Sequence, residues 1–412
     1  MDKIKRASCG ALALLLSLAT VSCGGGNPPG DDTSSTPPAP VSGSNVVAVT
    51  VDPGPSALTS PAVNTLFTTV TVCVPGSTTA CQTIDNIQVD TGSYGLRILS
   101  QVLTLTLPVL AASDGNALVE CTQFVDGYSW GPVASADVQI SSEAASSVPV
   151  QVIGASNFST VPSTCSSTGP AENTVTQFGA NGILGIGVFA QDCGAGCVQD
   201  ATPGYYYSCS TTTCGPIIVS LADQVQNPVP LFTTDNNGTI LELPSVAAGG
   251  AATVSGSLIF GIDTESNNAS GTQTVLTLDP STGYFTTAYN GTTLIDSFID
   301  SGTNGIFFND SSIAACTNSD FTGFYCPATT LNLSATLTGE NAISTTVDFS
   351  IGNAQTLATN NPTFAAFSTL GGSYPSSTTT FDWGLPFFYG RRVATAIQGY
   401  TTSVATGPYV AF

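Results

Sequence analysis

Short runs of apolar and β-branched residues, separated by clusters of glycine, proline, asparagine and serine, fill the chain from residue 45 onward. Several of these runs alternate apolar and polar positions, as in ADVQISS, VPVQVIG, TILELP and TVLTLD. Alternation with a period of two predicts half-buried β-strands, whereas helical patterns are few and short here. The pattern therefore predicts an all-β protein with enough strands for two lobes.

The N-terminus follows a different pattern. A basic start precedes an apolar stretch over 11–19, which is far shorter than the ~20 residues that cross a bilayer. These features are typical of a secretory signal over residues 1–22. Ser22 and Cys23, followed by glycines, resemble the lipidation site of bacterial lipoproteins. Residues 23–45 are rich in Gly, Pro and Ser, which is typical of a flexible tether.

These segments predict an exported protein that is anchored in the bacterial cell envelope through a lipid on Cys23. Glycine instead of aspartate after Cys23 favours the outer membrane, with the protein facing the periplasm or the cell surface.

The charged residues exclude several classes of function. Without residues 1–22 the chain keeps three arginines against 26 acidic residues, a side-chain charge of −23, and it has no lysine or histidine. No basic patch is available for nucleic acid. Catalysis by Ser-His-Asp or Cys-His, histidine-ligated metals and Schiff-base chemistry are excluded. Carboxylates must therefore carry any hydrolytic chemistry, and no cofactor or metal is predicted.

The cysteines predict disulfides. Twelve are present, and ten remain when Cys9 and Cys23 are set aside, an even number in an exported protein. Cys193 and Cys197 have two options, because they can pair with each other or with Cys209 and Cys214. The other close or bridgeable pairs are Cys73/Cys81, Cys121/Cys165, Cys209/Cys214 and Cys316/Cys326.

One long-period repeat carries candidate chemistry. IQVDTGSYGLRI, which contains Asp90, is echoed by SFIDSGTNGIFF, which contains Asp300. Each copy is followed by an apolar segment that leads into a glycine, at Gly185 and at Gly384. A single Asp-Thr-Gly is also an ordinary turn, whereas two copies after apolar strands, with matching downstream glycines, are far more specific. The repeat therefore indicates Asp90 and Asp300 as a pair of catalytic carboxyls.

This pattern resembles the pepsin-like aspartic proteases. NGILGIG, GSLIFGID and the closing WGLPFFYGRRVATAI are also similar to that family, so the resemblance covers most of residues 46–412. The chain further resembles bacterial lipoproteins of unknown function that share these motifs. The resemblance implies an all-β, bilobal pepsin-like acid protease fold, with pseudo-twofold related lobes at 46–232 and 233–412 and a cleft between them. It also implies a monomer that acts on a peptide or protein substrate.

The resemblance gives the two motifs a joint chemistry. Two carboxyls about 3 Å apart cannot both ionise, so Asp90 and Asp300 would share one proton at mildly acidic pH. One would take a proton from a water that attacks the peptide bond, while the other protonates the substrate. Gly92 and Gly302 would let the two loops approach closely.

Four hydroxyl side chains complete the implied site. Thr91 and Ser301 would lock the two loops to each other across the pseudo-twofold axis. Ser93 and Thr303 would hydrogen-bond the outer oxygens of the carboxylates. Every position of both motifs is thus filled by a chemically suitable residue.

The flap, the hairpin that covers the cleft in that family, departs from the usual pattern. The flap candidate QFVDGYSWGPVASADV puts Phe124 in place of the family's tyrosine, and Arg97 replaces the tryptophan that bonds to it. Tyr128 or Trp130 would substitute from the flap tip. Arg97 would either bind a substrate carboxylate or pair with an acidic side chain on the surface. A cation close to the two aspartates would lower their pKa values.

Two functions follow from these observations. The complete motifs favour an aspartic endopeptidase that acts at acidic pH outside the cytoplasm. The altered flap, together with a short acidic segment where the family has a basic prosegment, suggests a non-catalytic module that binds a peptide or glycan in the cleft. A carboxylate-pair glycosidase is disfavoured, because its acids stand roughly 5–10 Å apart and these loops would bring the aspartates closer.

Overall fold

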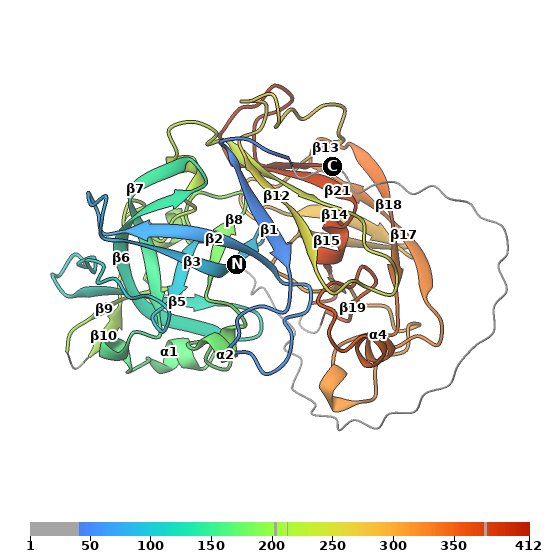
Figure 1. The fold of residues 1–412 in the computed structure, drawn as a ribbon, viewed down its shortest axis with the longest axis horizontal. Helices are drawn as coiled ribbons and strands as arrows, with labels where there is room; N and C mark the ends of the chain where they lie inside the picture. The colour runs from blue at the N-terminus through green and yellow to red at the C-terminus, as the bar shows by residue number, and fades with distance from the viewer. Residues whose placement is uncertain (1–40, 202–203, 212, 375–376) are drawn as a thin grey trace.

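Strands dominate the computed structural model, which describes residues 41–201, 204–211, 213–374 and 377–412. They form one sheet of 15 strands and one of seven. The amino-terminal half, blue to green in Figure 1, lies on one side of the molecule, and the orange and red strands of the carboxy-terminal half lie on the other. The predicted signal peptide, Cys23 and the tether up to residue 40 lie outside the described residues.

The larger sheet extends through the amino-terminal half and into the carboxy-terminal half. Its strands in spatial order are β10 (Cys214–Pro216), β9 (Tyr206–Cys209), β5 (Ala117–Gln123), β6 (Tyr128–Ile140), β7 (Glu143–Ile153), β4 (Tyr94–Leu99), β8 (Gly182–Ile186), β3 (Cys81–Asp90), β2 (Leu66–Cys73), β1 (Val46–Val51), β12 (Val254–Phe260), β11 (Gly238–Leu243), β21 (Arg391–Ala396), β22 (Tyr409–Ala411) and β13 (Val275–Thr277).

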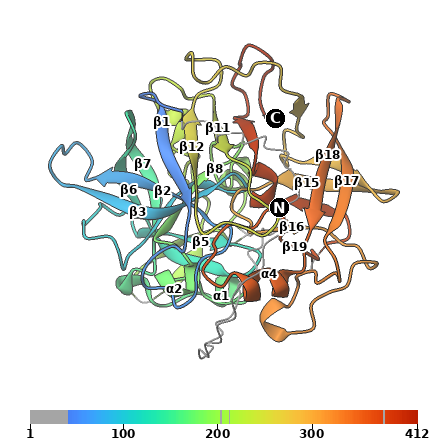
Figure 2. The same cartoon turned by 45° about the vertical axis from the view of Figure 1, so that its right-hand side comes forward.

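The smaller sheet belongs to the carboxy-terminal half, and its outer hairpin is seen at the edge of the molecule in Figure 2. Its strands are β18 (Ser344–Ile351), β17 (Leu331–Thr338), β14 (Phe285–Tyr289), β15 (Thr292–Ile299), β20 (Thr380–Trp383), β16 (Ile306–Phe307) and β19 (Gly371–Gly372).

The helices of the described chain are short, and none of them is long and apolar enough to cross a membrane. The α-helices are α1 (Ser163–Ser166), α2 (Val175–Phe178), α3 (Ala195–Gln199) and α4 (Ala354–Asn360), and the 3₁₀ helices are η1 (Ser156–Phe158), η2 (Val229–Leu231), η3 (Ser319–Phe321) and η4 (Leu385–Phe388).

One pattern of strand pairing occurs twice. In the amino-terminal half β3 runs parallel to β8, which is antiparallel to β4, and β4 is parallel to β7. In the carboxy-terminal half β15, β20, β16 and β19 repeat the same sequence of orientations. Asp90 ends β3 and Asp300 follows β15, so the two motifs occupy equivalent places. The predicted all-β, bilobal fold with pseudo-twofold related lobes is confirmed.

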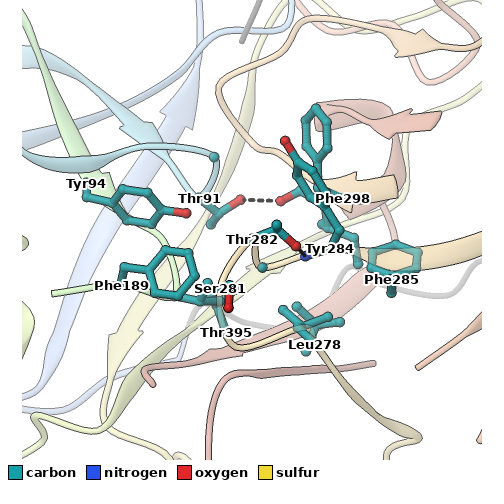
Figure 3. Close-up of a pocket in the computed structure, with 15 residues that line it drawn as sticks. Thr91, Tyr94, Phe189, Leu278, Ser281, Thr282, Tyr284, Phe285, Phe298 and Thr395 are labelled. Atoms are coloured by element: carbon teal, nitrogen blue, oxygen red, sulfur yellow. Dashed lines mark hydrogen bonds between the residues drawn. The ribbon is translucent and has the colours of Figure 1, made fainter. Parts of the chain in front are cut away.

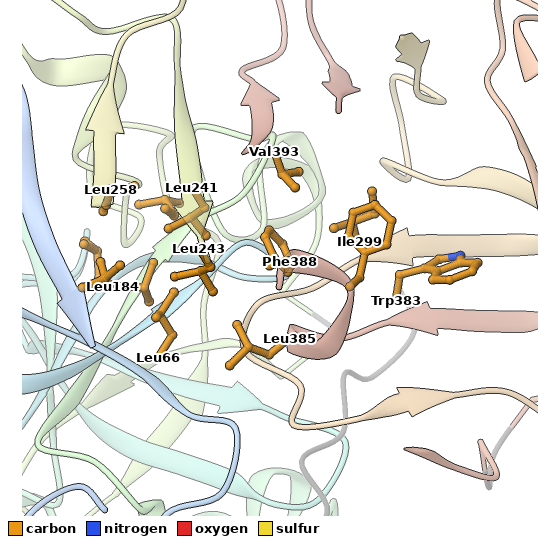
Figure 4. Close-up of a cluster of buried hydrophobic side chains, with 14 of the residues drawn as sticks. Leu66, Leu184, Leu241, Leu243, Leu258, Ile299, Trp383, Leu385, Phe388 and Val393 are labelled. Carbon is orange, nitrogen blue, oxygen red and sulfur yellow. The ribbon is translucent and has the colours of Figure 1, made fainter. Parts of the chain in front are cut away.

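The two halves share their packing. β1 pairs with β2 on one side and with β12 on the other, which carries the larger sheet across the boundary. Figure 4 shows apolar side chains from both halves, among them Leu184 and Trp383, in one continuous core. Asn45, the last residue assigned to the tether, is buried and donates to the carbonyl of Phe260 at 2.9 Å. The ordered domain therefore includes residues before β1.

Asn64 is a second link between the halves. Its side-chain amide donates to the carbonyls of Asn304, at 2.7 Å, and Phe367, at 2.8 Å. Its side-chain oxygen accepts from the backbone of Phe367 and from the hydroxyl of Tyr389. This buried amide satisfies polar groups that lie at least 240 positions further along the chain.

The predicted disulfides are confirmed, and Cys193 and Cys197 pair with each other. Five disulfides among the described residues are typical of an exported protein. They are Cys73–Cys81, Cys121–Cys165, Cys193–Cys197, Cys209–Cys214 and Cys316–Cys326.

Candidate active site

The two motif loops meet between the halves with their aspartates side by side. Asp90 and Asp300 are both buried, and their carboxyls are hydrogen-bonded to each other. Each carboxyl also accepts from its own loop. The backbone N–H of Gly92 donates to Asp90 Oδ1, and that of Gly302 donates to Asp300 Oδ1, each at 2.7 Å. The contact between the carboxyls is too close for the separated acids of a glycosidase.

The hydroxyl side chains make the contacts expected of them. Ser93 Oγ donates to Asp90 Oδ2 at 2.5 Å, and Thr303 Oγ1 donates to Asp300 Oδ2 at 2.8 Å. Together with the glycine N–H groups, these hydroxyls give both oxygens of each carboxyl a donor from its own loop. These donors stabilise carboxylate charge in a buried site that no arginine of the described chain contacts.

The loops are locked together by reciprocal hydrogen bonds. The backbone N–H of Ser301 donates to Thr91 Oγ1 at 2.9 Å, and that of Thr91 donates to Ser301 Oγ at 3.1 Å. Each hydroxyl then donates across the interface, from Thr91 to the carbonyl of Ile299 and from Ser301 to that of Val89. This double exchange fixes the separation of the two aspartates.

Asp90 and Asp300 form a dyad, and each of the two motif loops needs a glycine where it passes this dyad. A Cβ on Gly92 would lie 2.5 Å from Cγ of Asp300, and a Cβ on Gly302 would lie 2.5 Å from Cγ of Asp90. These separations are well inside van der Waals contact. Each loop thus closes over the carboxyl of the other loop.

Gly92→Ala is expected to lower any peptidase activity by about 100-fold, because the new methyl group must displace the Asp300 carboxyl from its position. The measurement is kcat/KM on an unfolded protein substrate. Gly249→Ala is the matched control, since its Cβ would meet nothing within 4 Å. Equal activity in the two variants would contradict this account of the close approach.

The two downstream glycines also lie at close backbone contacts. Gly185 pairs with Asp90 across β3 and β8, and a Cβ there would lie 2.5 Å from the amide of Tyr94. A Cβ on Gly384 would collide with the carbonyl of Gly305. Both glycines therefore let a neighbouring segment pack closely against a motif loop.

The environment of Asp300 disfavours its charged form. Burial is the main cause that raises its pKa well above the usual range, and the neighbouring charge of Asp90 adds to the effect. The hydrogen bonds from Thr303 and Gly302 act in the opposite direction. One proton is therefore retained on the pair at a pH where an isolated aspartate has lost it.

The hairpin predicted to be the flap is packed into the amino-terminal half. Phe124, in the turn between β5 and β6, contacts Phe178 edge to face at 5.9 Å. Trp130 is buried and donates its indole N–H to the carbonyl of Phe158 at 2.7 Å. Tyr128 is buried as well. The predicted substrate contacts of these three residues are wrong, because the segment that carries η1, α1 and α2 covers this end of the hairpin.

Arg97 is buried on β4, and its predicted contact with a substrate carboxylate is wrong. Its guanidinium contacts Glu120 at 2.6 Å and Asp192 at 3.1 Å, and it donates to the carbonyl of Tyr94 at 2.7 Å. Only 1% of its side chain is exposed, so a substrate cannot reach it. The alternative prediction, a pair with a surface acid, is correct about the acidic partner and wrong about its location, because Glu120 and Asp192 are both largely buried.

A pocket lies beside the dyad and between the two halves (Figure 3). Thr91 and Gly92 of the first motif loop border it. On one side, Tyr94 packs edge to face against Phe189, with ring centroids 5.2 Å apart. On the other side, Tyr284 stacks on Phe298, at 5.8 Å. The pocket is therefore an aromatic recess next to the first motif loop, and the sequence did not indicate these aromatic residues.

The structure also brings a third carboxyl to the site. Asp382, on β20, is buried, and its neighbours include Asp300 and the hydroxyl of Thr303. Sequence reasoning treated FDWG only as the segment that leads into Gly384, so it missed this residue.

The chain matches the family model described as protein of unknown function (DUF3443) over residues 41–412. No curated protein matches its sequence. Among solved structures, the aspartic proteinase from Irpex lacteus shares 15% sequence identity with the chain at a TM-score of 0.49. That similarity covers 89% of this chain and 96% of the other.

Proposed function

The chain belongs to the family described as protein of unknown function (DUF3443), and within it we propose that this protein is an aspartic endopeptidase. Asp90 and Asp300 are the proposed catalytic residues. The observation that carries the proposal is the paired arrangement of the two carboxyls, each held by a glycine N–H and a hydroxyl of its own loop.

The proposed reaction uses one proton shared by the two aspartates. A water between them gives a proton to the ionised carboxylate and attacks the carbonyl carbon of the peptide bond. The protonated carboxyl donates to the carbonyl oxygen. As the tetrahedral intermediate collapses, the C–N bond breaks, and the nitrogen leaves with a proton from the dyad. The aromatic recess between Tyr94 and Phe298 supports an apolar substrate side chain next to the cleaved bond.

The test is cleavage of a denatured protein by the wild type between about pH 3 and 7, with new peptide termini identified by mass spectrometry. The raised pKa of Asp300 predicts activity that is present at acidic pH and lost as rising pH removes the shared proton. A peptide analogue with a hydroxyl-bearing tetrahedral carbon at the cleavage position should block it, because it imitates the intermediate. Absence of cleavage by folded protein across this range would overturn the proposal.

A non-catalytic peptide-binding module is the second candidate, and the packed β5–β6 hairpin favours it. With Phe124 held against Phe178, this hairpin cannot supply the aromatic side chain predicted to lie over the cleft. Under this alternative, peptides with aromatic side chains bind the recess near Tyr94 and stay intact. Calorimetric titration alongside mass analysis distinguishes the two functions.

We further propose that the protein acts as a monomer outside the cytoplasm, held by a lipid on Cys23. The five disulfides support an exported protein. Mass analysis of the membrane fraction, compared with a Cys23→Ser variant, tests the lipid. Release of both forms into the soluble fraction would overturn the anchor.

A further inference from the structure

Asp382 is a buried carboxyl that the proposed reaction does not use. Only 1% of the residue is exposed, and neither carboxylate oxygen has a hydrogen-bond partner among the described residues. An ionised carboxylate in this setting would lack the donors that normally offset its loss of water. Its chemical state therefore requires explanation.

Strand geometry directs Asp382 toward the dyad. It pairs with Phe298 on β15 and with Phe307 on β16. Its neighbours Phe381 and Trp383 lie in the main core, stacked at 4.3 Å, so Asp382 points to the opposite face of β20. Phe298 borders the recess on that face, and Asp300 follows two residues later.

No cation of the described chain balances this carboxyl. The three arginines are engaged elsewhere, Arg97 with Glu120 and Asp192, Arg392 with Glu242, and Arg391 with the ring and carbonyl of Phe387. The sequence contains no histidine. The ionisable groups that face Asp382 are Asp300 and Asp90, both acidic. Burial is the main cause that raises the pKa of Asp382 well above the usual range, the two aspartates add to it, and the Thr303 hydroxyl acts in the opposite direction.

The hydroxyl of Thr303 connects the third carboxyl to the dyad. Thr303 has one hydroxyl hydrogen, and it is donated to Asp300 Oδ2. The Thr303 hydroxyl is the polar side-chain group beside Asp382, although no hydrogen bond joins the two as they stand. With its hydrogen committed to Asp300, the Thr303 oxygen can only accept from Asp382, and a carboxyl donates only when it is protonated.

We propose that Asp382 is a third, protonated carboxyl of the site and a positioning residue that keeps the hydroxyl hydrogen of Thr303 on Asp300. In the ionised form Asp382 would be an acceptor only and would compete with Asp300 for that hydrogen. Its protonation stands on the structure alone, whereas its effect on catalysis rests on the proposed function.

The first test compares wild type and Asp382→Asn in denaturant unfolding at several pH values from about 4 to 7. A carboxyl that is protonated in the folded state and ionised in the unfolded state costs stability as pH rises above its unfolded pKa. The wild type should therefore lose stability relative to the variant, by about tenfold in the unfolding constant per pH unit. A ratio that stays constant with pH would overturn the protonated state.

Two further variants serve this test, one as a control and one as a substitute for Asp382→Asn. Asp348→Asn removes an exposed carboxyl of β18 in the same half and should show a far smaller trend. Asp382→Leu, which carries no proton and no donor, should reproduce the trend of Asp382→Asn if the asparagine variant does not fold.

The second test is cleavage at acidic pH. The side-chain amide introduced by Asp382→Asn would still donate to Thr303, so this variant should keep kcat/KM within a few-fold of the wild type. Asp382→Leu should lose about tenfold or more, because the Thr303 hydrogen is no longer fixed on Asp300. Equal activity of the two variants would overturn the positioning role. The unfolding test needs no catalysis, so a pH trend without cleavage by the wild type would leave the third carboxyl in place and refute the endopeptidase.

Discussion

Replacing Asp90 or Asp300 with asparagine is expected to reduce peptide cleavage by about 10⁴-fold or more relative to the wild type. An amide keeps the shape of the carboxyl and can still accept from Gly92 or Gly302, but it cannot take up or release the proton that the reaction moves. The loss should appear in kcat, because the recess proposed to bind the substrate is lined by other residues.

The double variant identifies the two aspartates as one unit. Groups that act on the same proton are strongly non-additive, so Asp90→Asn with Asp300→Asn should be no less active than either single variant within the limit of detection. Asp348→Asn serves as the control, and disulfide content with circular dichroism reports the fold. Cleavage retained by either single variant would show that the dyad is not the catalytic site.

The dyad was predictable because the same short motif, which contains the carboxyl and its hydrogen-bond donors, occurs twice in the sequence. Each motif is four residues long, each follows an apolar strand, and the backbone N–H of its glycine donates within its own loop. The disulfides were predictable for a related reason, since four of the five close loops of ten residues or fewer. Information that lies within a few residues of the chain can be read from one sequence.

The other parts of the site depend on long-range packing. Asp382 reaches the dyad only because β20 pairs in parallel with β15, and no short motif encodes that register. Asn64 bonds to residues more than 200 positions away. Aligning a turn placed Phe124 over the cleft, whereas the packing of the segment containing Phe178 decided where that hairpin lies. The positions of such residues depend on strand pairing and burial, which cannot be derived from a single sequence.

Arg97→Met is expected to destabilise the folded protein by about 3–5 kcal/mol at neutral pH. Arg97, Glu120 and Asp192 form one buried cluster, in which the arginine is the one cation between two acids. Burial and the charge of Glu120 already raise the pKa of Asp192 well above its usual range, against the opposing effect of Arg97. Without the guanidinium, both carboxyls must remain buried without a countercharge or take up protons.

The pH dependence separates this electrostatic loss from a simple loss of packing. In the variant the folded state binds more protons than the unfolded state above the unfolded pKa of about 4, so the destabilisation should grow as pH rises from 4 to 7. Arg392→Met is the matched control. Its ion pair with Glu242 is partly exposed, and its loss should cost at most about 1 kcal/mol. Equal losses in the two variants, or a loss for Arg97→Met that does not change with pH, would contradict the buried cluster.

Arg97 also donates to the carbonyl of Tyr94, four residues beyond Asp90. An Arg97→Met variant that still folds should therefore cleave more slowly than the Arg392→Met control.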